Sequence, residues 1–187
     1  MSKLLLVLFI VVGMFSTSSR AALPDDLQDG QHVLLMRHAD APGFGDPPGY
    51  SLDNCSTQRN LGEKGRMQSV AIGKWLTEQR VTAANVKSSP WCRCMDTAKL
   101  IGKGNVEAES SLGSFFDDMS LAKPQTLAMQ KLIATQLRQH PSTPLILVTH
   151  HVNIEAYTNK VVGVGDMVLV KVKPDGSYIS HVVYPSP

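Results

Sequence analysis

Two short apolar runs, each followed by polar side chains, dominate the hydrophobic pattern of the chain. Val33–Met36 comes immediately before Arg37 and His38, and Leu145–Val148 comes just before His150. Four consecutive apolar residues between polar segments are typical of a strand that is buried on both faces. In open α/β sheets, the functional crevice lies beyond the carboxyl ends of such strands. We therefore expect functional side chains at both run ends.

Apolar residues at three- and four-residue spacing predict helices over 62–79, about 90–101 and 124–140, and another helix is expected to begin near Asn153. For the first helix, the predicted apolar face consists of Met67, Val70, Ala71, Lys74, Trp75 and Leu76. For the long helix, the predicted face consists of Leu127, Leu132, Ile133 and Leu137. Pro90 suits the first turn of its helix.

Further strands are predicted over 85–89 and 106–109, and alternation over 167–172 and 178–184, around Pro174-Asp175-Gly176, predicts an antiparallel hairpin. Strands separated by helices imply a mostly parallel sheet with helices on both faces. We therefore predict an α/β fold, a three-layer α/β/α sandwich.

The N-terminus has the pattern of a signal peptide. Lys3 precedes an apolar stretch from Leu4 to Met14, and Ser19 and Ala21 suit the positions upstream of a cleavage site before Ala22. The apolar stretch is shorter than the roughly 20 residues that span a bilayer. We expect residues 1–21 to be a signal peptide, residues 22–187 to form one domain without a membrane span, and the protein to be periplasmic or secreted. An uncleaved anchor is the alternative.

Charge and cysteine content narrow the functional classes. The formal net charge is +2, and two of the basic residues lie in the predicted leader, so the mature domain is near neutral. This argues against nucleic acid as a partner. In an oxidising compartment, Cys55 is expected to pair with Cys92 or Cys94, and the spacing of the three cysteines does not suggest a zinc site.

Three predicted strand ends carry side chains suited to an anion. The first ends in Arg37 and His38, the second leads into Arg93 at the start of a helix, and the third ends in His150. Parallel strands bring these ends to one edge, next to helix N-termini that favour anions. Arginine matches phosphate oxygens with two donors, and a neutral imidazole can act as the nucleophile in phosphoryl transfer. This chemistry requires no metal and no cofactor.

The motifs resemble those of the histidine phosphatase superfamily, in its phosphoglycerate mutase-like branch. The matching segments are Leu35-Met36-Arg37-His38-Ala39, with Ala39 in place of the usual glycine, Arg59–Ser69, Ser88–Ala98 and Val148-Thr149-His150. They occur in order over nearly the whole predicted domain. The resemblance implies a phosphatase that forms a phosphohistidine on His38, with Arg37, Arg93 and His150 as the phosphate cradle.

The chain departs from the family pattern at the general acid. Family members of the mutase type carry a glutamate two residues after a leucine in the loop that follows the third strand, and Ser114 stands there. Asp117 or Asp118 is the expected substitute, with a pKa raised by the neighbouring Phe115 and Phe116. The alternative is that both acids are solvated loop residues.

Two further residues are candidates for substrate binding. Arg59 either contacts the substrate or holds its own loop, and His151 either lines the pocket or begins a helix. Trp91 is expected to be part of the aromatic core or a wall of the pocket. The unpatterned loops 40–60 and 110–123 are expected to determine specificity.

Two functional hypotheses follow. The first is an exported phosphomonoesterase that acts on a small phosphorylated substrate such as a sugar phosphate or a lipopolysaccharide phosphate. The second is a non-catalytic anion-binding module that keeps the cradle and has lost turnover, which the missing glutamate favours. Retention of two histidines, His38 and His150, favours the enzyme.

Overall fold

The structure, a computed structural model, describes residues 22–187, so the predicted leader lies outside the described residues. The strands are β1 (His32–Arg37), β2 (Asn85–Ser88), β3 (Val106–Ala108), β4 (Leu145–Thr149), β5 (Met167–Val172) and β6 (Tyr178–Tyr184). The α-helices are α1 (Leu23–Leu27), α2 (Glu63–Glu78), α3 (Cys92–Leu100), α4 (Ala122–Gln139) and α5 (His151–Thr158). Three short 3-10 turns are η1 (Cys55–Thr57), η2 (Ser110–Leu112) and η3 (Met119–Leu121). In the part of the chain that the structure describes, no helix combines the length and the apolar character that crossing a membrane requires.

One six-stranded sheet, in the order β3-β2-β4-β1-β5-β6, organises the molecule. The first four strands in this order run parallel, whereas β5 is antiparallel to β1 and forms a hairpin with β6. The prediction of a mostly parallel sheet with a C-terminal hairpin is therefore confirmed. The register places Arg37 opposite Thr149, and Ser88 opposite Val148, so three strands end at the same edge.

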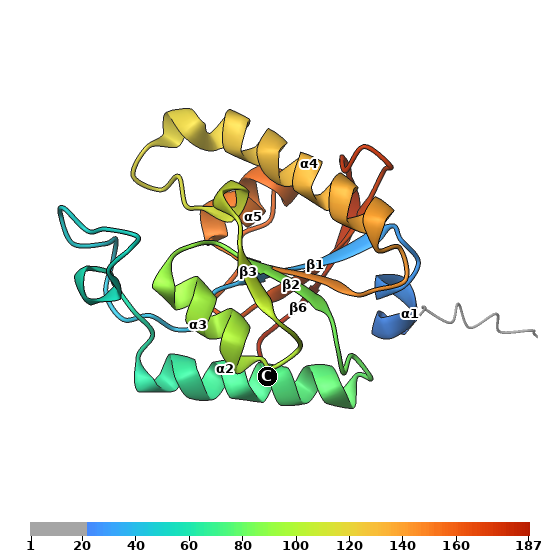
Figure 1. The fold of residues 1–187 in the computed structure, drawn as a ribbon, viewed down its shortest axis with the longest axis horizontal. Coiled ribbons are helices and arrows are strands. Elements are labelled where there is room, and N and C mark those ends of the chain that lie inside the picture. The colour runs from blue at the N-terminus through green and yellow to red at the C-terminus, as the bar shows by residue number, and fades with distance from the viewer. Residues whose placement is uncertain (1–21) are drawn as a thin grey trace, which may run out of the picture.

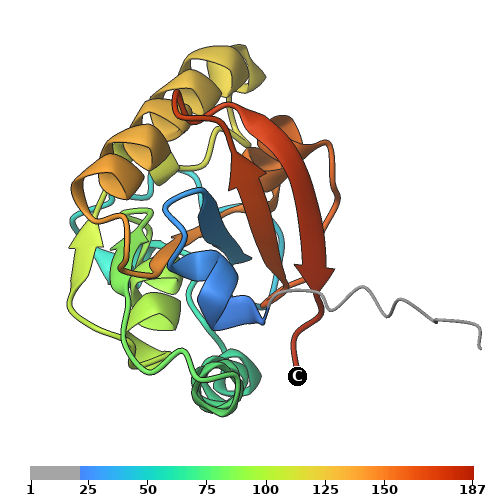
Figure 2. The same cartoon turned by 90° about the vertical axis from the view of Figure 1, so that its right-hand side faces the viewer.

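Helices cover both faces of this sheet, which gives three layers (Figures 1 and 2). In Figure 1, α4 and α5 lie above the sheet, and α2 and α3 lie below it. The pleat of β1 explains the separation, because successive side chains point to opposite faces. Leu34 and Met36 pack in the core on the side of α2 and α3, and Val33 and Leu35 pack in the core on the side of α4 and α5.

The predicted apolar faces of the two long helices were partly wrong. Met67 and Val70 of α2 are exposed, and the buried residues of this helix are Gly65, Ser69, Ile72, Gly73 and Leu76. Leu127 of α4 is also exposed, and the buried residues of this helix are Met129, Ile133 and Leu137. Small residues let α2 approach its neighbours closely, so its buried face is less hydrophobic than a pattern search expects.

Three element boundaries also differ from the predictions. Helix α1, for which the sequence pattern predicts no element, lies before β1; Pro24 supports its first turn, and Leu23 and Leu27 are buried. Helix α3 begins at Cys92 rather than Pro90, and α5 begins at His151 rather than Asn153. The last shift matters for the site, because it places His150 at the N-cap position of α5, where its side chain makes no capping hydrogen bond.

Candidate functional site

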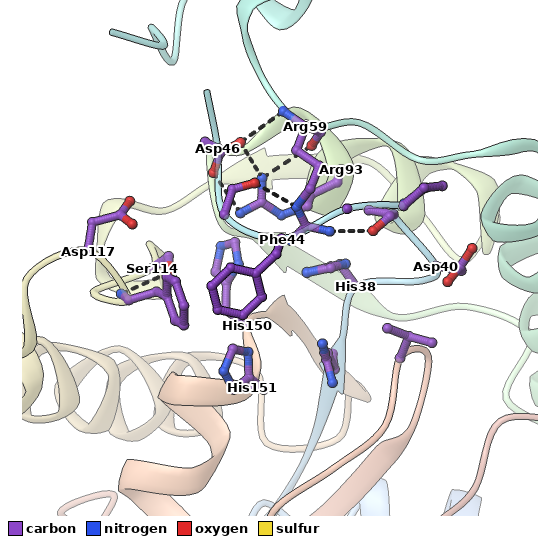
Figure 3. A pocket seen from close by; sticks show the side chains of 17 residues that line it. His38, Asp40, Phe44, Asp46, Arg59, Arg93, Ser114, Asp117, His150 and His151 are labelled. Atoms are coloured by element: carbon purple, nitrogen blue, oxygen red, sulfur yellow. Dashed lines mark hydrogen bonds and ion pairs between the residues drawn. The ribbon is translucent and has the colours of Figure 1, made fainter. Parts of the chain in front are cut away.

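A cavity of about 420 Å³ lies at the carboxyl ends of the parallel strands. Its lining includes every predicted site residue, namely Arg37, His38, Arg59, Arg93, Asp117, His150 and His151. Figure 3 shows His38 and His150 in the floor of this pocket, with Arg59, Arg93 and Asp46 above them. The loop 40–60, which forms the projecting cyan segment of Figure 1, supplies one wall of the pocket.

The parallel pairing of β1 and β4 brings the two histidines together. The backbone N–H of His38 donates to the carbonyl of Thr149 over 3.0 Å, which extends the ladder past the end of β1. His150 follows Thr149, so the two imidazole rings lie 5.5 Å apart between centroids, at an angle of 70°. The backbone N–H of Ser89 donates to Val148, and this bond places the start of α3 on the other side of His150.

The environment of His38 leaves one of its ring nitrogens free for chemistry. Its Nδ1 lies 2.8 Å from the carbonyl oxygen of Ala39, an acceptor, so Nδ1 carries the hydrogen and Nε2 has the lone pair. The imidazole is buried, and burial, with a smaller contribution from the nearby arginines, lowers its pKa to about 3. His38 is therefore a neutral base at neutral pH.

Ala39 takes the place of the expected glycine without disrupting the site. Its side chain is fully buried, and its backbone N–H donates to the Thr97 hydroxyl over 3.1 Å. The carbonyl of the same residue orients His38. With alanine at this position, the backbone N–H and the carbonyl of residue 39 both make hydrogen bonds.

His150 has two hydrogen-bonding neighbours on its far side. Its Nε2 lies 2.8 Å from the Ser89 hydroxyl and 3.5 Å from the Cys94 sulfur. Burial raises the pKa of the Cys94 thiol to about 12, so this cysteine keeps its proton, which it donates to the Thr149 carbonyl over 3.7 Å. Burial, together with His38, holds the pKa of His150 well below its ordinary value. A neutral His150 that accepts at Nε2 carries its hydrogen on Nδ1.

Arg37 is held by the loop that precedes β5. Its Nη1 donates to the Val162 carbonyl over 2.9 Å, and Asp166 lies near enough to favour its charged form. Burial acts in the opposite direction and lowers the pKa of this guanidinium. Within residues 22–187, its buried Nε has no hydrogen-bond partner. An anion in the pocket would satisfy such a donor.

Asp46, a residue that sequence reasoning missed, pairs with Arg93. The two carboxylate oxygens of Asp46 accept from Nη1 and Nη2 of Arg93 over 2.9 and 3.0 Å, and both side chains are almost fully buried. Hydrogen bonds from Arg93 and Arg59 outweigh burial and lower the pKa of Asp46, although burial is the largest single influence. Asp46 lies in a loop rich in glycine and proline, and no sequence pattern there indicated that it pairs with Arg93.

Arg59 combines the two roles considered for it. It lines the pocket, and its guanidinium also donates to the carbonyls of Gly45 (2.9 Å) and Ala41 within its own loop. Burial and the neighbouring Arg93 lower the pKa of Arg59. Arg59 therefore keeps a positive charge at the pocket while holding the curve of the loop.

The disulfide joins Cys55 to Cys92, one of the two predicted pairings. It ties η1 of the 40–60 loop to the first residue of α3, next to Arg93. The third cysteine, Cys94, is free and buried beside His150. The covalent link therefore anchors the pocket wall to the helix that carries Arg93.

Aromatic side chains line the mouth of the pocket. Phe116 lies 5.1 Å from Phe44 and 5.8 Å from His151 between ring centroids, so it bridges the 40–60 loop and α5. His151 thus lines the pocket and also begins α5. Trp91, by contrast, belongs to the core and donates from Nε1 to Asp46 over 3.1 Å.

The two candidate acids differ in position. Asp117 lines the pocket and is exposed, and the phenol of Tyr50 near it has a raised pKa, through burial and the charge of Asp117. Asp118 does not line the pocket, because its carboxylate accepts from the Ser120 N–H and caps η3. Phe115 is buried away from the pocket lining. Of the two, Asp117 alone faces the substrate space.

Gln68 connects the pocket to the helix layer below it. Its Oε1 accepts from the backbone N–H of Asp40 over 2.9 Å, and its Nε2 donates to the Val164 carbonyl over 3.0 Å. Asp40 and Val164 both line the pocket. The glutamine of the sequence motif is therefore a brace between two pocket segments.

Among the described residues, the side chains with metal-ligand spacing are Asp26, Asp29 and His32. They lie around the start of β1, whereas the pocket lies at its end, and His32 Nδ1 is already within 2.8 Å of Asp29. Within the pocket, three arginines and three histidines are set for an anion.

Comparison with known proteins agrees with this site. Residues 33–116 match the family model of the histidine phosphatase superfamily, branch 1. The matched range includes Arg37, His38 and Arg93 and ends before His150. The family model covers less than half of the chain, and together with the fold it confirms the resemblance to the histidine phosphatase superfamily. No curated protein matches the chain.

Solved structures of phosphatases share the fold. The protein histidine phosphatase SixA complexed with tungstate has a TM-score of 0.55 and 16% identity, with 82% of this chain and 94% of that chain covered. A mycobacterial glucosyl-3-phosphoglycerate phosphatase with inorganic phosphate has a TM-score of 0.60 and 15% identity, with coverage of 84% and 97%. A phosphoserine phosphatase from Entamoeba histolytica in complex with 3-phosphoglyceric acid has values of 0.57 and 12%, with coverage of 81% and 94%. At these identities, the similarity is one of fold.

Proposed function

We propose that this protein is an exported phosphomonoesterase that works through a phosphohistidine on His38. The observation that carries the proposal is the tautomer of His38, whose Nδ1–H is held by the Ala39 carbonyl while Nε2 keeps its lone pair beside Arg37, Arg93 and His150. A site for passive anion binding has no need of a buried neutral imidazole with a directed lone pair, whereas phosphoryl transfer does.

The first transfer forms a bond between His38 Nε2 and phosphorus and breaks the bond between phosphorus and the ester oxygen. The arginines stabilise the charge that spreads over the phosphoryl oxygens, and the Nδ1–H of His150 donates to one of them. The leaving oxygen takes a proton and departs as an alcohol.

The second transfer regenerates the enzyme. A water molecule attacks phosphorus and passes a proton to the carboxylate that protonated the leaving oxygen, and the bond between Nε2 and phosphorus breaks to release inorganic phosphate. Since His38 has its Nδ1 proton fixed by Ala39, the same nitrogen is available as nucleophile and as leaving group.

We assign the proton for the leaving group to Asp117, which reaches the pocket from the 110–123 loop. Asp117→Asn should slow hydrolysis of an alkyl phosphate by about tenfold or more and leave an aryl phosphate almost unaffected, because a phenolate needs little protonation. Asp118→Asn is the matched control, since that carboxylate caps η3. Equal loss on both substrates would argue against the acid role.

For the substrate, we propose a small phosphate ester such as a sugar phosphate, or the phosphate of a lipopolysaccharide. The aromatic pair Phe44 and Phe116 at the mouth supports a ring-shaped leaving group. Arg59 and His151 are the proposed contacts to its polar groups.

For location, we propose the periplasm or secretion, supported by the leader pattern and by a disulfide that an oxidising compartment would maintain. Mass analysis of the exported protein should give an N-terminus at Ala22.

The test is hydrolysis of an aryl phosphate and a sugar phosphate by residues 22–187, with His38→Ala beside His140→Ala, an exposed histidine outside the pocket. Turnover that is lost in His38→Ala and kept in His140→Ala supports the proposal. Acid-labile phosphate on the wild-type protein after quenching identifies the intermediate. Phosphate binding without turnover of either ester would instead support the anion-binding module.

A further inference from the structure

Arg93 meets a protein carboxylate where a phosphate-cradle arginine would be expected to face only its ligand. Asp46 pairs with it through both oxygens, at 2.9 and 3.0 Å, in a nearly dry environment. Such a carboxylate has one of two effects. It either competes with phosphate for the guanidinium, or it fixes the guanidinium so that its remaining donors face the ligand.

A count of the guanidinium hydrogens separates these two effects. Arginine has five N–H donors in a planar fork. Asp46 takes one hydrogen from Nη1 and one from Nη2, and the carbonyl of Arg59 takes the second hydrogen of Nη1 over 3.2 Å. The Nε–H and the second Nη2–H remain. These two lie on the same edge of the plane, and the buried Nε has no hydrogen-bond partner among the described residues. One complete two-donor edge is therefore left for a phosphate.

Asp46 is itself held in place by groups other than Arg93. Its Oδ1 accepts from the backbone N–H of Arg59 over 2.9 Å, and its Oδ2 accepts from Nε1 of Trp91 over 3.1 Å. The loop that carries it is tied to the first residue of α3 by the Cys55–Cys92 disulfide. The carboxylate is thus a fixed support against which the flexible side chain of Arg93 is set.

We propose that Asp46 is a positioning residue for phosphate recognition. It holds Nη1 and Nη2 of Arg93, so that the remaining edge of the guanidinium, formed by Nε–H and the second Nη2–H, binds two phosphoryl oxygens. The proposal rests on the proposed phosphatase function for its substrate, but it concerns phosphate affinity and is testable without turnover. It also gives the 40–60 loop a role at the phosphate itself, in addition to lining the space for the leaving group.

The experiment measures the KM of an aryl phosphate, the inhibition constant of inorganic phosphate, and the phosphate-dependent rise in Tm. Asp46→Asn removes the charge at constant shape, and the amide cannot accept from all four surrounding donors. We expect KM and the phosphate inhibition constant to rise together by about tenfold, the scale of one charge-assisted hydrogen bond, with a smaller change in kcat. Asp46→Glu should recover part of the affinity.

A double-variant cycle shows whether the effect passes through Arg93. In an Arg93→Ala background, Asp46→Ala should change phosphate affinity by less than about twofold, because the group that it positions is gone. The double variant also avoids an unpaired buried charge, so it keeps the test valid if Asp46→Ala alone does not fold. Asp53→Asn, an exposed acid in the same loop, is the control for the change in charge.

Three results would overturn the proposal. A lower phosphate inhibition constant in Asp46→Asn would show that the carboxylate competes with phosphate. An equal loss with and without Arg93 would show a purely structural role, and no change would show that Arg93 is positioned by other groups. If the wild-type protein hydrolyses neither ester, the phosphatase proposal fails, and the Tm shift with inorganic phosphate still decides the role of Asp46.

Discussion

At the scale of single residues, the site depends on histidines that are kept neutral by burial. The pKa of His38 falls to about 3 because the folded protein removes its ring from water and places arginines nearby. His150 and His151 are shifted in the same direction, mainly by burial. The same burial that keeps His38 a neutral imidazole also makes the folded state sensitive to acid.

We expect this shift to appear in the pH dependence of stability. Between pH 6.5 and about 3, the unfolded chain binds a proton at His38 that the folded chain does not bind. Stability is therefore fully present above pH 6.5 and is lost as the pH falls. Between pH 8 and pH 5, His38→Asn should lose about 2 kcal/mol less unfolding free energy than the wild type, measured by urea titration. Equal losses would contradict the low pKa of His38.

The hydroxyl of Ser89 is expected to fix the tautomer of His150, because it lies 2.8 Å from Nε2. Ser89→Ala should lower kcat by about tenfold, the scale of one hydrogen bond of roughly 1.4 kcal/mol, with little change in KM. The neighbouring Ser88→Ala is the control, since that hydroxyl bonds only to the carbonyl of Ser89. Steady-state kinetics on an aryl phosphate test the prediction. An equal effect of the two variants would assign the loss to packing.

At the scale of elements, the position of the pocket depends on how closely α2 packs against the segment that follows β1. A Cβ added at Gly65 would lie 1.9 Å from the backbone oxygen of Asp40, which lines the pocket. Glycine at position 65 therefore allows the backbone of α2 to lie in close contact with the backbone of Asp40. Gln68, one turn later, uses that approach to bond the Asp40 N–H.

Gly65→Ala should consequently destabilise the fold by about 1–3 kcal/mol, the usual cost of overpacking, and raise KM by moving Asp40. Thermal unfolding and aryl phosphate kinetics measure the two effects. Lys64→Ala, an exposed position on the same helix, provides the comparison and should change neither. A fully stable Gly65→Ala variant would mean that α2 can shift without cost.

At the scale of the whole molecule, one covalent link joins parts that the sheet alone leaves separate. The Cys55–Cys92 disulfide closes a loop with a sequence separation of 37 residues between the pocket wall and α3. In the chain-entropy description, a loop of this length corresponds to about 4 kcal/mol of stabilisation. The link lies beside Arg93, so it stabilises the wall of the site as well as the fold.

Two measurements test this link. Thiol titration of the unreduced, denatured protein should find one reactive group, Cys94, and three after reduction. The double variant Cys55→Ser with Cys92→Ser should lose about 2–4 kcal/mol of unfolding free energy. Three free thiols without reductant would show that the bond does not form, and an undiminished stability would show that it contributes nothing to the fold.

The sequence by itself determined the order of the strands and of helices α2 to α5, the mostly parallel sheet and the strand-end residues of the pocket. An apolar run such as Val33–Met36 can be recognised in the sequence because a strand that is buried on both faces has no alternation of apolar and polar residues. Arg37 and His38 come directly after this run, so the sequence also places them at the end of the strand. The resemblance to histidine phosphatases added their expected roles, which stay predictions until kinetics test them.

Only the tertiary structure decided which residues from distant segments meet at the pocket. Asp46 lies 47 positions from Arg93 in the chain, and no local pattern connects a loop acid with a helix arginine. The partner of Cys55 and the inward direction of Asp117 were open for the same reason. The buried face of α2 was misread because close backbone contact, at Gly65 and Gly73, replaces hydrophobic volume there. Local sequence specifies local conformation, whereas contacts between distant segments depend on how the layers pack.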